Sequence, residues 1–164
     1  MTLYLFRHAK AGERARWEGD DFLRPLSNRG RRQAEGLVDL LAGVHLDRVL
    51  SSPYVRCMES VVPLAGRRCL PVEPVEALAE GAALDAVLSL VRKHAHRETL
   101  MCTHGDVIPM LLEHYSRNGL ALAPAPQWPK GSTWVLELDG NGDAFAARYL
   151  PPPTDRPAGG RPAG

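Results

Sequence analysis

The chain has 164 residues, enough for one domain with little room for a second. Hydrophobic residues make up 45% and charged residues 24%, as in ordinary soluble globular proteins. The net charge of +1 and the pI of about 7.8 give no electrostatic indication of a nucleic-acid polymer or a membrane as a partner.

The three cysteines, Cys57, Cys69 and Cys102, are odd in number and lack CxxC spacing. This pattern argues against a disulfide framework and against a zinc site. No apolar run approaches the roughly 20 residues of a membrane span, and the first residues lack the basic region of a signal peptide. We therefore expect a protein of the reducing cytoplasm.

The first predicted strand is the apolar run Thr2 to Phe6, in which Leu3 and Leu5 alternate with aromatic residues. The run stops at Arg7-His8. Such a strand delivers a cation and a nucleophile to the edge where open α/β sheets bind ligands.

The next segment, Ala9 to Ser27, is polar and long for a connection between a strand and a helix, which usually takes about 2–6 residues. Long loops at the end of a central strand are either functional lids or disordered, and Trp17 and Phe22 favour a lid. Ser27 is the predicted N-cap of a helix that Gly43 ends. The apolar face of this helix is Ala34, Leu37, Val38 and Leu41.

A second short strand is predicted at Arg48 to Ser51, and Ser52-Pro53 is the predicted start of the next helix. Pro63 should kink or end that helix. The prolines of Leu70 to Val75 indicate a weak edge strand.

The second half of the chain continues the alternation of helices and strands. The spacing of Leu84, Val87, Leu88 and Val91 predicts a third helix, and Glu98 to Thr103 predicts a strand that stops at His104-Gly105. The remaining elements are a helix on Ile108, Leu111, Leu112 and Tyr115, a Pro-rich loop from Ala123 to Pro129, a strand from Ser132 to Asp139, a turn at Asn141-Gly142 and a strand from Ala144 to Leu150.

This order predicts an α/β fold, a three-layer αβα sandwich with a mostly parallel central sheet and a C-terminal antiparallel strand or hairpin. Residues 1–150 form the predicted domain. Residues 151–164 are rich in Pro, Gly and Ala and have almost no apolar bulk, so we expect a disordered tail.

Four side chains with the chemistry of a phosphoryl site follow the predicted parallel strands. His8 and His104 each end a strand, Arg7 precedes His8, and Arg56 lies in the first turn of the helix after a third strand. In a parallel sheet these positions share one edge. Arginine forks match a tetrahedral oxyanion, and the backbone N–H groups of a helix beginning at Ser52 would add donors.

At this point the sequence resembles the histidine phosphatase superfamily, also called the phosphoglycerate-mutase-like family. Four segments carry the resemblance, in the family's order and spacing: Leu-Phe-Arg-His-Ala at 5–9, Leu-Ser-Asn-Arg-Gly-Arg-Arg-Gln-Ala at 26–34, Ser-Ser-Pro-Tyr-Val-Arg at 51–56 and Thr-His-Gly at 103–105. Together these segments are highly specific, although Arg-His alone would be weak. The match extends to about Leu138.

The resemblance implies a role for each residue. His8 would be a neutral nucleophile that forms a phosphohistidine, while Arg7, Arg56 and His104 hold the phosphoryl oxygens. A carboxylic acid would protonate the leaving oxygen and then activate water. Glu80 is the best match for this acid, with Glu76 second and Asp85 third. No metal and no cofactor is implied.

The sequence differs from the family's motif at two positions, which indicate the branch of the family that it resembles. Ala9 replaces the usual glycine, and Lys10 stands where an acid is usual. With the short chain, they indicate the small phosphatases, similar to phosphohistidine phosphatases and to the phosphatase domain fused behind Nudix hydrolases. The Nudix segment itself does not occur in this chain. Arg14 falls where family members often place a further phosphate ligand. With Lys10, Arg24 and Lys130 it would bind a second phosphate.

The predicted function is a metal-independent phosphohydrolase acting on small phosphorylated metabolites, including nucleotides. A protein phosphohistidine phosphatase and a non-catalytic phosphate-binding module stay open as alternatives, and a mutase is disfavoured by chain length. Each residue also has an ordinary structural interpretation: surface ion pairs for Arg7, Arg56 and His104, solvated loop positions for the four outer cations, and loop anchors for Trp17 and Trp128. Neither the substrate nor the oligomeric state follows from the sequence.

Overall fold

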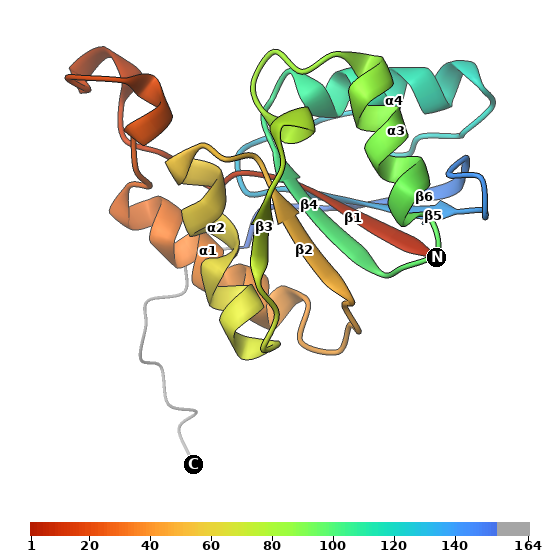
Figure 1. The fold of residues 1–164 in the computed structure, drawn as a ribbon, viewed down its shortest axis with the longest axis horizontal. Coiled ribbons are helices and arrows are strands. Elements are labelled where there is room, and N and C mark those ends of the chain that lie inside the picture. The colour runs from red at the N-terminus through yellow and green to blue at the C-terminus, as the bar shows by residue number, and fades with distance from the viewer. Residues whose placement is uncertain (154–164) are drawn as a thin grey trace.

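One sheet of six strands runs through the protein (Figure 1). The structure, a computed structural model, describes residues 1–153. The strand order is β3-β2-β4-β1-β5-β6, with bounds β1 Thr2–Arg7, β2 Arg48–Ser51, β3 Val72–Pro74, β4 Thr99–Thr103, β5 Thr133–Leu138 and β6 Ala144–Leu150. The first four strands in this order are parallel, and β5 and β6 form an antiparallel hairpin at the other edge. The predicted sheet is confirmed, including its hairpin and its edge strand β3.

Helices cover both faces of this sheet, so the predicted three-layer αβα architecture is also confirmed (Figure 1). On one face lie α1 (Asn28–Leu40) and α2 (Val55–Arg67), which pack against each other. On the other lie α3 (Leu84–His94) and α4 (Val107–Arg117). Three short 3₁₀ turns complete the described elements: η1 (Arg14–Arg16), η2 (Asp21–Leu23) and η3 (Glu76–Leu78).

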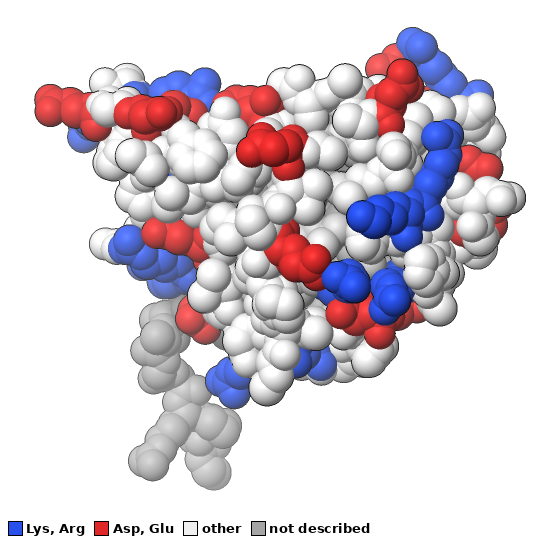
Figure 2. Space-filling view, viewed as in Figure 1, with Lys and Arg blue, Asp and Glu red and all other residues white. Residues whose placement is uncertain are grey.

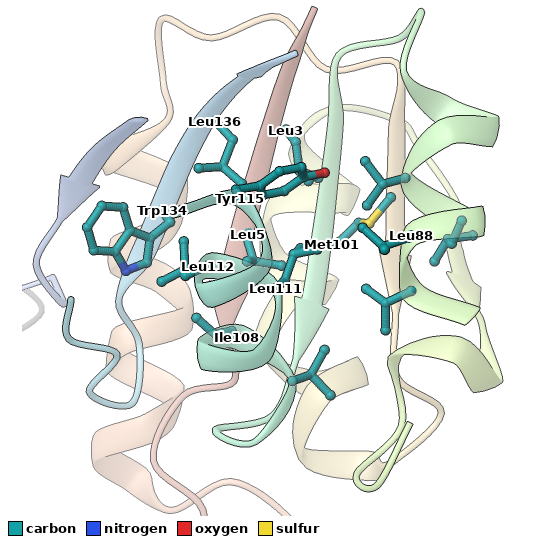
Figure 3. Packing of buried hydrophobic residues seen from close by; sticks show 14 of the residues in the cluster. Leu3, Leu5, Leu88, Met101, Ile108, Leu111, Leu112, Tyr115, Trp134 and Leu136 are labelled. Atoms are coloured by element: carbon teal, nitrogen blue, oxygen red, sulfur yellow. The ribbon is translucent and has the colours of Figure 1, made fainter. Parts of the chain in front are cut away.

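The central strand β1 is buried on both faces, which explains why its sequence is apolar throughout. Leu3 and Leu5 point to the side of α3 and α4, where they pack with residues such as Met101 and Leu111 (Figure 3). Tyr4 and Phe6 belong to the core on the side of α1 and α2. The strand therefore has little freedom to shift its register, because a slip of one residue would exchange the two sets of side chains.

The register of the parallel strands brings the predicted site residues to one edge. Arg7 at the end of β1 pairs with Thr103 at the end of β4, and Ser51 at the end of β2 pairs with Cys102. The segments that follow β1, β2 and β4 therefore start side by side. His8 and His104 are the first residues beyond two of these strands.

Two predicted helix boundaries are wrong, the start of α2 and the end of α1. Helix α2 begins at Val55 rather than at Ser52, because the Ser52 backbone N–H still donates to the Cys102 carbonyl and Pro53 disfavours helical backbone before it. Pro63 lies inside α2 and does not end it. Helix α1 ends at Leu40, before Gly43, although the N-cap is confirmed: the Ser27 hydroxyl accepts from the Gly30 N–H.

The segment from Ala9 to Ser27 is an ordered loop that carries η1 and η2 and projects beyond the layers next to α2 (Figure 1). At the other end of the chain, Pro153 packs against Gly36 of α1. Residues 154–164 of the predicted tail lie outside the described residues.

Candidate active site

His8 is buried and held in one tautomer. Its ring Nδ1 lies 2.8 Å from the Ala9 carbonyl, which can only accept, so Nδ1 carries the proton and Nε2 keeps its lone pair. Burial, and then the charges of His104, Arg56 and Arg7, lower the pKa of His8 to about 3, although the hydrogen bond to Ala9 opposes this shift. The imidazole is therefore neutral near pH 7 and can act as a nucleophile.

Two arginines flank this imidazole. Arg7 donates from Nη1 to the Trp128 carbonyl at 2.8 Å, and its guanidinium lies against Gly105, where an added Cβ would stand 2.7 Å from Cζ. The close approach explains the glycine after His104. Arg56 is only 1% exposed and donates to the backbone carbonyl of Asp21 at 2.9 Å.

His104 completes the group and is 2% exposed. Its Nε2 lies 2.8 Å from the Ser52 hydroxyl and 3.5 Å from the Cys57 sulfur. Its ring meets the His8 ring edge-on, with 5.3 Å between the centroids. The structure therefore brings together all four residues of the predicted constellation.

These residues also hold polar atoms that lack a partner. Nε of Arg7, Nε of Arg56 and Nδ1 of His104 are buried and have no hydrogen-bond partner among the described residues. Buried polar groups in native proteins are nearly always satisfied, so a group of exceptions needs an explanation. An oxyanion bound between the arginines and histidines would accept from such donors.

The same four residues line a cavity of about 500 Å³. All the other cations predicted for a second phosphate line it too: Lys10, Arg14, Arg24 and Lys130. Burial, and then the charges of Arg7, Arg24, Lys10 and Arg56, lower the pKa of Lys130. Positive charge thus converges on this cavity.

Glu80 is the predicted acid that the structure places in the cavity. Its carboxylate is 38% exposed and lies 3.2 Å from Nη2 of Arg56 and 3.2 Å from Nη2 of Arg14. The other two candidates, Glu76 and Asp85, are exposed and do not line the cavity. Asp106 lines it, but one of its oxygens accepts from the Gly81 N–H at 2.7 Å.

Sequence reasoning missed Asp21, which binds the long loop to the site. Its carboxylate lies 3.1 Å from Arg56, 2.8 Å from Arg24 and 3.4 Å from Arg14. Burial acts to raise the pKa of Asp21, but the hydrogen bond from Arg24 and the charges of Arg56 and Arg14 outweigh it and lower this pKa. One available signal was the spacing of Asp21 and Arg24, three residues apart in a short turn.

Ser60 was also missed. This buried hydroxyl accepts from the Ala9 N–H at 2.9 Å and donates to the Arg56 carbonyl at 2.6 Å. It therefore ties the segment after His8 to the helix that carries Arg56. A signal was present, since Ser60 lies one turn beyond Arg56 on the apolar face with Cys57 and Val61.

The aromatic residues of this region contact the loop or Arg56 and do not line the cavity. Trp17 and Trp128 do not line the cavity; Trp17 donates from its ring to the Asp20 carbonyl, which suits a loop anchor. The guanidinium of Arg56 lies over the ring of Tyr54, with 4.7 Å from Cζ to the ring centroid, and Tyr54 makes a tilted ring contact with Phe22 of the loop. Cys57 and Cys102 are buried, as expected of small hydrophobic residues.

Residues 1–153 contain no cluster of three or more His, Cys, Asp or Glu side chains that could hold a metal ion. Within the same residues, no helix has the length and apolar character needed to cross a membrane.

The chain matches known proteins along most of its length. The family model "Histidine phosphatase superfamily (branch 1)" matches residues 3–83. An 8-oxo-(d)GTP phosphatase of Mycolicibacterium smegmatis is 35% identical over 162 residues, which cover 94% of this chain and 49% of that protein. The chain spans about half the length of the curated relatives it matches.

Solved structures share the fold. The protein histidine phosphatase SixA complexed with tungstate has a TM-score of 0.75 at 19% identity, covering 92% of this chain and 94% of that chain. A putative phosphohistidine phosphatase SixA from Agrobacterium tumefaciens has a TM-score of 0.73 at 27% identity, covering 92% of this chain and 98% of that one.

Proposed function

Because this chain belongs to branch 1 of the histidine phosphatase superfamily, we propose that it is a phosphohydrolase acting through a phosphohistidine on His8. The observation that carries the proposal is the set of buried, unpartnered nitrogens of Arg7, Arg56 and His104 around a neutral imidazole. The SixA structure with tungstate supports it, since tungstate is a tetrahedral oxyanion.

The first step is an in-line attack by Nε2 of His8 on phosphorus. The N–P bond forms while the P–O bond to the leaving group breaks, and the leaving oxygen keeps the electron pair. Arg7, Arg56 and His104 donate to the oxygens of the transferred group, where charge develops. These donors neutralise the phosphoryl group, so the proposal requires no metal ion.

The acid in this scheme is Glu80. It gives a proton to the leaving oxygen and, in the second step, takes one from the water that attacks the phosphohistidine. The N–P bond then breaks, its electron pair returns to Nε2, and inorganic phosphate leaves. The presence of Glu80 in the cavity favours this enzyme over a non-catalytic phosphate-binding module.

For the substrate, we propose small phosphorylated metabolites, with nucleotides foremost. The relative from Mycolicibacterium smegmatis is named for 8-oxo-(d)GTP, and the outer cations Lys10, Arg14, Arg24 and Lys130 suit a second phosphate. Protein phosphohistidine is the second candidate, favoured by the likeness to SixA structures. A side-by-side assay of a nucleotide panel and a phosphohistidine protein separates them by kcat/KM.

The test of the mechanism is capture of the intermediate. Turnover of a ³²P-labelled substrate is stopped with detergent at alkaline pH, and the label on the protein is then exposed to acid. We expect acid-labile label on the wild type and none on His8→Ala. An unlabelled wild type, or full activity in His8→Ala, would refute the mechanism.

Glu80→Gln should lower kcat by about 10²- to 10⁴-fold. The variant should also accumulate label, because water is no longer activated. Glu76→Gln, an exposed carboxylate outside the cavity, is the matched control and should behave as the wild type. Unchanged activity in Glu80→Gln would show that another group is the acid. It would not contradict the role of His8 as the nucleophile.

A further inference from the structure

A second cavity of about 580 Å³ adjoins the candidate active site. Lys10 and Lys130 line both cavities and therefore stand at their boundary. The rest of the second wall comes from Arg29, Gln33 and three prolines. Nothing in the proposed transfer to His8 uses this space.

The backbone that carries the two lysines is held in place by Gln33, which is 5% exposed. Its side-chain oxygen accepts from the Lys10 N–H at 2.9 Å, and its side-chain nitrogen donates to the Lys130 carbonyl at 3.3 Å. The Lys10 carbonyl accepts from both the N–H and the hydroxyl of Ser27, each at 2.9 Å. The lysines thus extend from fixed points, as preorganised ligand sites require.

The charges of the two cavities differ. The first cavity contains three carboxylates, Glu13, Glu80 and Asp106, beside its cations. Among the described residues that line the second cavity there is no acid, while Lys10, Arg29 and Lys130 are basic. An anionic group beyond the transferred phosphoryl group is therefore favoured on this side and not on the side of Glu80.

We propose that the second cavity holds the remainder of a phosphoanhydride substrate, with the phosphate next to the transferred group bound between Lys10 and Lys130. The ligand class is a nucleoside diphosphate or triphosphate, whose nucleoside part would occupy the second cavity. This inference rests on the proposed function.

With a nucleoside diphosphate, the terminal phosphoryl group would be transferred to His8. His8 attacks the terminal phosphorus, the bond to the bridging oxygen breaks, and the electron pair stays on that oxygen. The bridging oxygen becomes a terminal oxygen of the departing nucleoside monophosphate. Lys10 and Lys130 neutralise the charge of this departing phosphate, a group that a phosphomonoester of an uncharged alcohol does not contain.

The kinetic test compares guanosine diphosphate with p-nitrophenyl phosphate, which has no second phosphate. We divide kcat/KM for guanosine diphosphate by kcat/KM for p-nitrophenyl phosphate. In Lys10→Met and in Lys130→Met, this ratio should fall at least tenfold. Arg31→Met, exposed on α1 and outside both cavities, is the matched control and should keep the wild-type ratio.

Arg14→Met tests on which side of the transferred phosphoryl group the rest of the substrate lies. Arg14 lines only the first cavity, on the side of Glu80. The proposed placement predicts a smaller shift of the ratio than in the lysine variants. An unchanged ratio in both lysine variants, or a shift confined to Arg14→Met, overturns the proposal.

A binding test does not depend on turnover. In the His8→Ala protein, guanosine monophosphate should bind at least tenfold more weakly when Lys130→Met is added, as measured by calorimetry. Equal dissociation constants overturn the subsite. Lysine-dependent binding, together with a wild-type protein that forms no phosphohistidine during turnover, would instead support the subsite and refute the proposed function.

Discussion

The proposed nucleophile is oriented by main-chain and hydroxyl groups. The Ala9 carbonyl fixes the tautomer of His8, and the Ala9 N–H is itself fixed by Ser60. Because Ser60 also bonds the Arg56 carbonyl, one hydroxyl couples the position of the imidazole to that of the buried guanidinium. Such coupling holds attacking and stabilising groups at a constant separation, which transition-state stabilisation requires.

The lowered pKa of His8 predicts a dependence of stability on pH. The pKa of His8 is about 3 in the folded protein and 6.5 for an unperturbed histidine, so between these values the unfolded chain binds a proton that the folded protein does not. Stability therefore rises with pH across this window and is fully regained above 6.5. At pH 5 the free energy of unfolding should be about 2 kcal/mol lower than above pH 6.5 because of His8. Replacing His8 by Gln should remove this difference.

Urea denaturation at pH 5 and pH 8 measures this difference, in buffers free of phosphate because an anion would bind the site. The difference between the two free energies of unfolding should be smaller in His8→Gln than in the wild type. His96→Gln removes an exposed imidazole and should leave the difference as in the wild type. Equal differences in all three proteins would contradict a neutral, buried His8.

At the residue scale, Arg7, His8, Arg56 and His104 could be predicted as a group because each follows a strand or opens the next helix in a recognisable motif. Their roles in catalysis stay predictions. Asp21 and Ser60 were missed because their signals in the sequence are weak: their partners are main-chain groups or arginines that only folding brings close.

At the scale of elements, hydrophobic periodicity was sufficient for the inner strands and the helices, because their buried faces are nearly uninterrupted. The edge strands β3 and β6 have no fully buried residue and were predicted from prolines and from a turn instead. The start of α2 was mispredicted for a specific reason. Serine is a common N-cap residue, but the Ser52 hydroxyl contacts Nε2 of His104. The Ser52 N–H donates to the Cys102 carbonyl and so continues the hydrogen bonding between β2 and β4. A residue used by the site was therefore mistaken for one that begins a helix.

The loop from Ala9 to Ser27 is held in part by residues of the site. Its turn η2 contacts α2 through Asp21, whose carboxylate and carbonyl both bind Arg56. Phe22 adds an aromatic contact with Tyr54, at 5.0 Å between centroids. These contacts hold a loop whose outer residues, such as Arg14 and Arg16, are exposed.

Asp21→Asn should release this loop, because the amide keeps the shape of the side chain and loses the charge shared with three arginines. We expect a loss of roughly 1–2 kcal/mol of stability, reduced by the partial exposure of Asp21. We also expect faster cleavage by trypsin after Arg14 and Arg16, followed by mass spectrometry. Cleavage at the wild-type rate would show that Asp21 does not hold the loop.

The control for this variant is Glu13→Gln, in the same loop. Glu13 pairs with Arg16 at 3.1 Å, but both side chains are exposed. An exposed pair of this kind contributes little, so stability should change by less than about 0.5 kcal/mol.

At the scale of the whole molecule, the net charge of +1 hides an uneven distribution. Over the face shown in Figure 2, acidic and basic side chains lie side by side. The first cavity instead contains six Lys and Arg residues and three carboxylates among the described residues. A nearly neutral protein can therefore present a positive field at one site, which overall composition does not reveal.

This local field predicts that kcat/KM falls with ionic strength even though the net charge is small. Between 10 and 150 mM salt the Debye length shortens from about 30 to about 8 Å, so charges around the cavity no longer attract a distant anion. We expect kcat/KM for an anionic phosphate substrate to fall several-fold, with kcat nearly constant. Lys10→Gln should flatten this dependence, while Lys93→Gln, exposed on α3 and outside both cavities, should not. Equal salt dependence in the wild type and both variants would mean that the cavity charges do not steer the substrate.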